Sequence, residues 1–216
     1  MTRAIDARRR RLLAGSAATL ALGNTPARLL AALAPTPAQT MGPFYPRRPP
    51  LETDNDLVRV SGQGGLAQGA ITDLSGRVLD PAGEPVDDAV IEIWQCDANG
   101  GYHHVSCGRR AARDPNFQGF GTFTTGTDGV YRFRTIRPVP YPGRAPHIHF
   151  RVRAPGEPEL VTQLYVAGHP RNAGDWILAR AGDAAARRRL IVDFEPVDDP
   201  EAQLAARFDI VLARRG

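Results

Sequence analysis

From residue 70 onward, short runs of apolar and β-branched residues alternate with turns rich in Gly, Pro and Asp. Runs of this kind are typical of β-strands. Eight of them predict strands, at 74–79, 89–95, 121–125, 130–136, 147–153, 160–166, 189–194 and 207–212. Apolar residues have helical spacing only at 173–180. The pattern therefore predicts an all-β fold, an antiparallel β-sandwich with long loops.

Residues 41–69 differ from the rest, because Pro, Gly and Asp dominate and apolar periodicity is absent. This segment predicts an extended, irregular N-terminal arm rather than a strand or a helix. We expect residues 39–216 to form one domain that carries this arm at its start.

The composition supports a single globular domain. The chain has 216 residues, 42% of them hydrophobic, which is enough for a core and argues against disorder. With 22 Gly and 19 Pro against 7% aromatic residues, a helical bundle is disfavoured.

Residues 1–38 have the organisation of an export signal. Four arginines at 8–11 precede a modest apolar stretch, 12–22, and small-residue cleavage sites follow. Paired arginines before a weakly hydrophobic stretch resemble a twin-arginine signal, which predicts a periplasmic or exported protein. An amphipathic N-terminal helix is the alternative. We expect no membrane span in the mature protein.

The basic charge belongs mostly to this leader. All 27 basic residues are Arg, and residues 1–40 contain six of them and one acid. The remainder has 21 Arg against 22 Asp and Glu, so the body is electrically balanced. A nucleic-acid partner is not expected, because such proteins carry a basic surface on the folded part. Cys96 and Cys107 could pair in an oxidising compartment, but their spacing does not decide this.

Two histidines predict a metal site. In the expected strand 147–153, His147 and His149 share one face about 6.5 Å apart by strand geometry, whereas Ile148 and Phe150 face the core. Two imidazoles at this distance can bind one metal, although two polar residues on a solvated face are the alternative.

Two tyrosines indicate which metal this site would bind. Tyr102 follows the strand 89–95, and Tyr141 lies in the Pro-rich loop just before His147. A phenol must ionise to bind a metal, and its ordinary pKa is about 10. A hard trivalent cation favours that ionisation, so two Tyr and two His indicate Fe(III) rather than Zn(II) or Fe(II). Each tyrosine alone is consistent with an ordinary loop residue.

The motifs QTMGPFYP, WQCDANGGY, FRTIRPVPYPGRAPHIHF and VTQLYVAG stand in an order that resembles the intradiol ring-cleavage dioxygenases, in particular the protocatechuate 3,4-dioxygenase-like branch. The resemblance covers residues 39–170. It implies Fe(III) bound by Tyr102, Tyr141, His147 and His149. It further implies O2-dependent cleavage of a small catecholic diol to a cis,cis-muconate-type product.

The resemblance also assigns roles around the metal. Tyr141 is the displaceable ligand that takes a substrate proton, Arg144 stabilises the oxidised substrate, and Gln163 lies near the same ring carbon. The GPFYP segment is expected to wrap towards the pocket, which makes Tyr45 a substrate contact together with Arg144. Packing of this arm on a neighbouring subunit is an equal alternative. Family members commonly assemble, so a homo-oligomer is possible.

The sequence departs from the family in two ways. The segment from Tyr141 to His147 is short, and the long N-terminal helical domain of the catechol branch is absent. The substrate therefore stays open, and four arginines could meet a substrate carboxylate: Arg47, Arg48, Arg109 and Arg110.

Two other functions are alternatives for this sequence. A non-catalytic β-sandwich binding module would not need all four ligand side chains. A cupin-type His-x-His enzyme would need a further carboxylate and histidine, and Glu157 and His169 lie in apparent turns.

Overall fold

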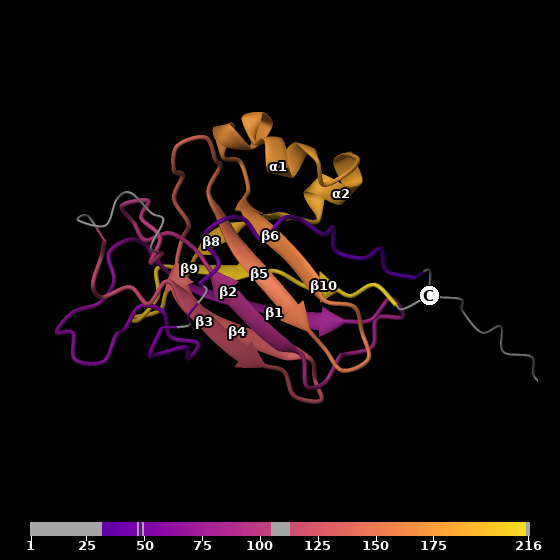
Figure 1. The fold of residues 1–216 in the computed structure, drawn as a ribbon, viewed down its shortest axis with the longest axis horizontal. Coiled ribbons are helices and arrows are strands. Elements are labelled where there is room, and N and C mark those ends of the chain that lie inside the picture. Colours follow the sequence, from indigo (N-terminus) through magenta and orange to yellow (C-terminus); the bar gives the residue numbers. More distant parts are fainter. Residues whose placement is uncertain (1–31, 47, 49, 105–112, 215–216) are drawn as a thin grey trace, which may run out of the picture. The chain divides into compact units, whose positions relative to one another are not determined.

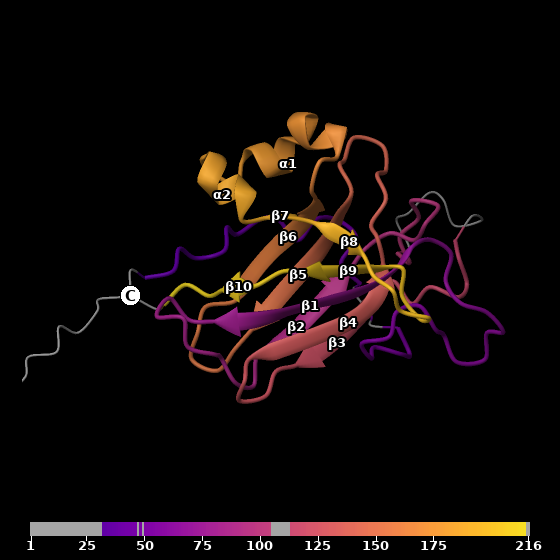
Figure 2. The same ribbon diagram turned by 180° about the vertical axis from the view of Figure 1, so that it is seen from behind.

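The computed structural model describes residues 32–46, 48, 50–104 and 113–214, and it forms a β-sandwich (Figures 1 and 2). In these residues the strands are β1 (Ile71–Leu79), β2 (Val90–Trp94), β3 (Phe120–Thr124), β4 (Val130–Ile136), β5 (His147–Arg153), β6 (Leu160–Val166), β7 (Ile191–Val192), β8 (Phe194–Pro196), β9 (Leu204–Arg207) and β10 (Ile210–Val211). The helical elements are a 3-10 turn, η2 (Pro170–Gly174), and the helices α1 (Trp176–Ala179) and α2 (Ala184–Arg188). The predicted strands 130–136, 147–153 and 160–166 are confirmed to the residue.

One sheet is built around β1, which pairs with β4 on one side and with β9 and β10 on the other, while β8 extends β9. The other sheet has the order β3-β2-β5-β6-β7. The predicted β-sandwich is confirmed, and its sheets are mixed, because β1 pairs in parallel with β9 and β10, and β6 pairs in parallel with β7. A parallel pair needs a long crossover, and η2, α1 and α2 fill the one between β6 and β7.

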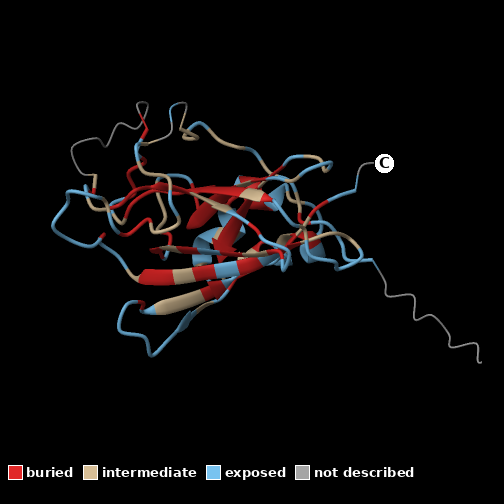
Figure 3. Cartoon of the chain, turned by 90° about the horizontal axis from the view of Figure 1, so that it is seen from below, coloured by how far each residue is buried: buried red, intermediate tan, exposed pale blue. Residues whose placement is uncertain are grey.

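The core lies between the two sheets, where buried residues concentrate (Figure 3). Strand β5 shows the expected alternation, since Ile148, Phe150 and Val152 are fully buried in this core. The predicted strand at 189–194 is interrupted and becomes β7 and β8, and β9 was not predicted. The sequence of β9, LAAR, has no β-branched residue, so its strand is specified by pairing with β1 and β8 rather than by propensity.

The segment before the predicted arm, residues 33–39, hydrogen-bonds to the sandwich. Leu33 N–H donates to Pro81 O (2.7 Å), Thr36 N–H to Val211 O (2.9 Å) and Gln39 N–H to Val161 O (2.7 Å). The packed body therefore starts before residue 39 in the described chain. Residues 1–31, which hold most of the predicted signal, lie outside the described residues, as does Cys107. A pairing of Cys107 with the buried Cys96 stays a prediction.

Candidate metal centre

Strand β5 presents two imidazoles on one face, as its alternation predicts. His147 and His149 are 1% and 2% exposed, and their ring centroids lie 4.8 Å apart. β5 is a central strand, so His149 has Trp94 of β2 on one side and Gln163 of β6 on the other. The indole of Trp94 stacks on the His149 ring with centroids 4.8 Å apart and an interplanar angle of 6°. The pairing of three strands thus fixes this histidine.

Tyr102 is delivered by a tight loop after β2 that a buried aspartate organises. Both carboxylate oxygens of Asp97 accept backbone hydrogen bonds, from Asn99 and Gly101 on one oxygen and from Asp114 on the other, each 2.9 Å long. Asp97 is fully buried, and the loop it holds leaves Tyr102 only 2% exposed. The tyrosine is therefore held rigidly rather than exposed on a mobile loop.

Tyr141 lies in a turn directly before β5. Arg144 N–H donates to Tyr141 O at 3.0 Å, and Gly143 has a φ of +81°, a conformation that glycine adopts without strain. The turn brings the Arg144 Nη1 within 3.5 Å of the Tyr141 hydroxyl. The short connection to His147 therefore suffices to place tyrosine, arginine and histidine side by side.

The four predicted ligands come together around one point. Ring centroids lie 5.6 Å apart for Tyr102–Tyr141, 5.4 Å for Tyr141–His147 and 6.3 Å for Tyr102–His149. The Tyr102 hydroxyl is 3.3 Å from His147 Nε2. Within the described residues no three His, Cys, Asp or Glu side chains gather as a metal site.

Electrostatics make the two histidines neutral donors. Burial, assisted by the nearby Arg144 charge, lowers the pKa of His147 to about 3. Burial, together with His147 and Arg144, also lowers the pKa of His149 well below its usual value. Both rings are therefore neutral at pH 7, the form in which an imidazole nitrogen can bind a cation.

The two phenols keep their protons unless a cation compensates them. Burial is the main cause that raises the pKa of Tyr102 well above its usual value, with Cys96 and Tyr141 adding to it. Burial also raises the pKa of Tyr141, although Arg144 opposes that shift. Ionised phenolates in this setting require a strongly charged ion next to them, and a ferric ion meets that requirement.

The donor set fits a ferric ion. Two neutral imidazoles and two phenols that ionise under a trivalent charge match its preference for hard anionic oxygen together with nitrogen. Within the described residues, the buried Nδ1 of His149 has no hydrogen-bond partner. His147 differs, because its Nδ1 lies 2.7 Å from Ala145 O, which leaves Nε2 towards Tyr102.

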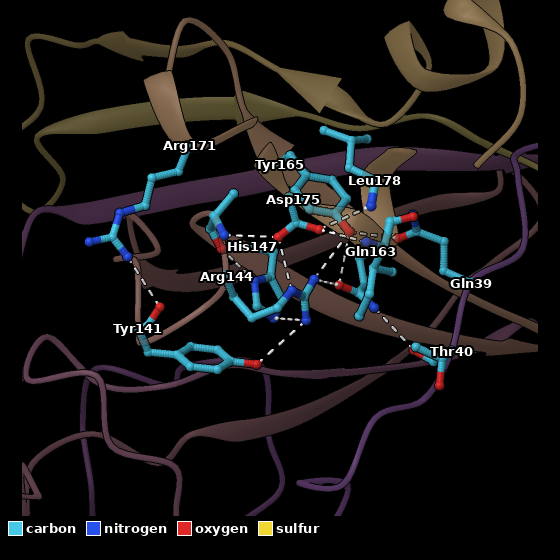
Figure 4. A network of polar contacts seen from close by, with 12 residues as sticks. Gln39, Thr40, Tyr141, Arg144, His147, Gln163, Tyr165, Arg171, Asp175 and Leu178 are labelled. Atoms are coloured by element: carbon cyan, nitrogen blue, oxygen red, sulfur yellow. Dashed lines mark hydrogen bonds and ion pairs between the residues drawn. The ribbon is translucent and has the colours of Figure 1, made fainter. Parts of the chain in front are cut away.

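Arg144 connects Tyr141 and His147 to a polar network that includes Gln163 and Tyr165 (Figure 4). It is 8% exposed, and Nη2 donates to Gln163 Oε1 at 2.7 Å and to the Tyr165 hydroxyl at 3.2 Å. Nη1 faces the ring cluster, 3.5 Å from the Tyr141 hydroxyl and 3.4 Å from His147 Nε2. Arg144 therefore lies beside the ring cluster, with Gln163 next to it.

Sequence reasoning missed two members of this network. Tyr165, two residues after Gln163 on β6, shares its face, and its hydroxyl accepts from Arg144. Asp175 forms a buried ion pair with Arg144, with Nε and Oδ2 2.9 Å apart. The period-2 rule applied to β6 could have found Tyr165, whereas Asp175 follows an irregular crossover and carries no such signal.

The N-terminal arm closes the cluster from the side, as one of the two expectations for GPFYP foresaw. Thr40 O accepts from Gln163 Nε2 at 3.0 Å, and the Phe44 ring stacks on Tyr102 with centroids 4.5 Å apart. Gly42 has a φ of +72°, and a Cβ there would lie 3.3 Å from His149 Cε1. Glycine is therefore needed both for the backbone conformation and for the close approach.

Tyr45 anchors this arm. Its hydroxyl donates to Glu92 Oε2 at 2.8 Å and accepts from Arg151 Nη1 at 2.9 Å, and its ring packs edge-on against Trp94. The hydroxyl is thus engaged away from the four rings. Substrate contact by Tyr45 stays a prediction, and the anchoring role is what the geometry gives it.

Of the arginines named as possible contacts for a substrate carboxylate, Arg48 lines a pocket together with Tyr102 and Phe44. Arg48 is exposed, and Arg47, Arg109 and Arg110 lie outside the described residues. Glu157 lies half-buried in a turn after β5, which is where the sequence placed it.

Comparison with known proteins agrees with this geometry. A family described as dioxygenases matches residues 40–214. The protocatechuate 3,4-dioxygenase beta chain of Burkholderia cepacia is 40% identical over 172 residues, which are 75% of this chain and 72% of that protein. The catechol 1,2-dioxygenase of Candida albicans is 32% identical over 82% of this chain, which spans only 60% of that protein.

A solved structure is also similar. It is the dioxygenase domain of a dioxygenase carbohydrate-binding protein fusion from Streptomyces sp. SirexAA-E, with 32% identity and a TM-score of 0.65. The match covers 84% of this chain and 100% of that one.

Proposed function

The chain belongs to the intradiol ring-cleavage dioxygenases, a family of oxidoreductases, and from this premise we propose that it opens the ring of a catecholic aromatic with O2 at a ferric ion held by Tyr102, Tyr141, His147 and His149. The product of catechol itself would be cis,cis-muconic acid, which contains every atom of one catechol and one O2. The observation that carries the proposal is the convergence of two phenols and two neutral imidazoles on one point beside Arg144.

A bound ferric ion would draw electron density from a chelated diol and so activate its ring towards O2. The diol must lose two protons to chelate. Tyr141 is the residue suited to accept one of them, because it is half-buried while Tyr102 is buried. An unbound Tyr141 phenolate would be a strong base, since burial raises the pKa of Tyr141. The second proton would pass to solvent, and one of the two negative charges of the deprotonated diol would replace the charge that Tyr141 gives up.

Arg144 is placed to stabilise negative charge on the ring. Its guanidinium is charged at any working pH, and the Nη1 group points at Tyr141, whose hydroxyl would be displaced. If His147 Nε2 held the ion and the Tyr141 hydroxyl held a substrate proton, the Arg144 Nη1 hydrogens would lose both neighbours and could donate to the substrate. Fixed donors of this kind stabilise developing charge effectively in a dry site.

The arm would keep water from the reacting ring. Gly42 lies against His149, and Phe44 covers one face of Tyr102. Both positions are held by Tyr45, whose hydroxyl bonds to Glu92 and Arg151. Water exclusion strengthens the electrostatic interactions at the ring.

The test combines a spectrum with a product. The purified protein, loaded with Fe(III), should show a visible tyrosinate-to-iron absorption band, and it should consume O2 with catechol, protocatechuate or hydroxyquinol. With 18O2, a muconate-type acid should contain both labelled atoms. A colourless loaded protein, or one that consumes no O2 with any of the three, would favour a binding module instead.

Export by the twin-arginine pathway is a separate part of the proposal. Because Leu33 and Thr36 hydrogen-bond to the sandwich, we expect the leader to be cut before Leu33. The mass of the secreted protein tests this, and its sedimentation behaviour tests whether it forms a homo-oligomer. No helix in the described ranges is both long and apolar enough to span a membrane.

A further inference from the structure

One buried carboxylate connects helix α1 to the metal cluster. Asp175 is 1% exposed and lies in the crossover between β6 and α1 (Figure 4). Its Oδ1 accepts the N–H groups of Ile177 and Leu178, both at 3.0 Å, and so caps α1. Its Oδ2 accepts Arg144 Nε and Ala145 N–H, both at 2.9 Å. All four contacts are made by one side chain.

The contact with Arg144 helps to hold two nitrogens of its guanidinium in place and leaves the third, Nη1, facing the ring cluster. Asp175 holds Nε, and Gln163 and Tyr165 hold Nη2. Only Nη1 faces the cluster. A planar guanidinium anchored at two of its three nitrogens cannot rotate about its long axis, so the direction of Nη1 follows from the position of the Asp175 carboxylate.

The contact with Ala145 acts on a metal-ligand candidate. Ala145 is 1% exposed, and its carbonyl oxygen lies 2.7 Å from His147 Nδ1. Because this oxygen accepts a hydrogen bond from Nδ1–H, it fixes the tautomer of His147 and leaves Nε2 as the nitrogen that can bind a metal. By holding Ala145 N–H, Asp175 holds the residue whose carbonyl orients the imidazole.

We propose that Asp175 is a positioning residue that sets both the direction of Arg144 Nη1 and the orientation of His147 through a single carboxylate oxygen. The inference rests on the proposed function for its catalytic consequence, although its structural part concerns the chain alone. Within the described residues, the hydrogen bonds of the Asp175 carboxylate go to Arg144, Ala145, Ile177 and Leu178 and to none of the four candidate ligands, so its influence on the site is exerted through Arg144 and Ala145.

The chemistry requires a carboxylate and not an amide. Four N–H groups converge on two oxygens, two on each. An asparagine offers one oxygen and one NH2 group, so one of the two pairs of donors would face another donor. A serine at this position could still cap α1, since serine is a favoured N-cap residue, but it is too short to reach Arg144.

The experiment compares two aspartates that begin short helices. Asp175→Ser removes the link to Arg144 and Ala145 while keeping a capping hydroxyl. Asp183→Ser is the matched control, because Asp183 caps α2 by accepting Ala186 N–H at 2.7 Å and contacts none of the four rings. For Asp175→Ser we expect a loss of about 10–100-fold in iron affinity, kcat or both, with KM changed much less. Asp183→Ser should match the unmodified protein in all three.

Folding is controlled by a second variant and by a measurement on the unmodified protein. Asp175→Asn keeps the side-chain volume of the aspartate, and it replaces Asp175→Ser in the same measurements if Asp175→Ser does not fold. In the metal-free unmodified protein, the NMR signal of the Arg144 Nε proton, assigned by its loss in Arg144→Gln, should exchange slowly with solvent. A folded Asp175 variant with unchanged iron affinity and kcat, or a rapidly exchanging Nε proton, would overturn the proposal. If the unmodified protein cleaves no diol, the proposed function fails, while iron affinity and proton exchange still test the role of Asp175.

Discussion

The Tyr102 hydroxyl lies 3.3 Å from His147 Nε2, although 45 residues separate the two side chains in the sequence. Tyr102 is placed by the Asp97 loop after β2, and His147 by the first position of β5, which pairs with β2. Their proximity is therefore set by the loop that Asp97 holds and by the pairing of β2 with β5. Ligands that the fold itself positions lower the cost of ordering them around an ion.

Replacing Tyr102 by Phe should abolish or strongly shift the visible iron band. The substitution removes the hydroxyl that contacts His147 and Tyr141, while the ring would keep its stack on Phe44. We expect the metal-free variant to lose about 1–2 kcal/mol of unfolding free energy, roughly the net value of one or two hydrogen bonds. Absorption spectra after ferric loading, together with urea unfolding, check both expectations.

Tyr45→Phe provides the control. It removes a hydroxyl that bonds to Glu92 and Arg151 and not to the four rings. The iron band should persist in this variant. An unchanged band in Tyr102→Phe, or an abolished one in Tyr45→Phe, would contradict the ligand assignment.

The alternation of β5 was readable from the sequence because strand side chains follow a simple period. It placed His147 and His149 on one face and Ile148 and Phe150 in the core, which the structure confirms. Tyr102 and Tyr141 lie on loops, where no period applies, and the motif resemblance rather than periodicity singled them out. Their convergence with the histidines depends on how β2 and β5 pair, which is non-local.

Asp175 shows why the remainder of the site was not predictable. In the sequence it lies within the predicted helical stretch 173–180, with nothing that sets it apart. In the structure its Oδ1 caps α1, which begins at the next residue. The function of Oδ2 appears only when the crossover after β6 folds back onto Arg144, 31 residues earlier. The parallel pairing of β9 and β10 with β1 was missed for the same reason.

Gly42→Ala should weaken the metal site selectively. A methyl group at this position would lie 3.3 Å from His149 Cε1, in a backbone conformation with φ of +72°. Gly62→Ala is the matched control, since its φ is +80° and its new methyl would meet nothing within 4 Å. Each variant should lose about 1 kcal/mol of stability from backbone strain.

Only Gly42→Ala should also bind iron less tightly, because it displaces His149 or the arm. Ferric titration monitored by the visible band separates the two variants. Equal iron affinity in both would show that the arm does not press on His149.

Gly76→Ala should be among the most destabilising small substitutions in the sandwich. A Cβ on Gly76 of β1 would lie within 3 Å of the backbone carbonyl of Phe208 and of the Tyr131 hydroxyl. Backbone cannot retreat as a flexible side chain can, so we expect a loss of about 1–3 kcal/mol or more, as for other overpacked sites. Gly64→Ala, in open space, should stay within about 0.5 kcal/mol of the unmodified protein. Urea denaturation of the two variants and the unmodified protein decides this, and equal stabilities of the two variants would refute the close packing at Gly76.

Acid should remove the stabilisation that Asp175 provides. Burial alone would raise the pKa of Asp175, but hydrogen bonds from Leu178 and Ala145 and the Arg144 charge outweigh it and hold that pKa below its usual value. The folded protein therefore binds this proton less readily than the unfolded chain, whose Asp pKa is about 3.9. The contribution is fully present above the unfolded pKa and is lost as the pH falls through the folded one.

The unfolding free energies of the unmodified protein and of Asp175→Asn should accordingly differ most near pH 7 and converge below about pH 4. The difference at pH 7 should persist in high salt, because the ion pair is buried and poorly screened. For Asp183→Asn the difference should be smaller and salt-sensitive, since Asp183 is exposed. A gap for Asp175→Asn that stays constant from pH 7 to pH 3 would mean that the ionised carboxylate does not stabilise the fold, and the link between Asp175 and Arg144 would then be geometric only.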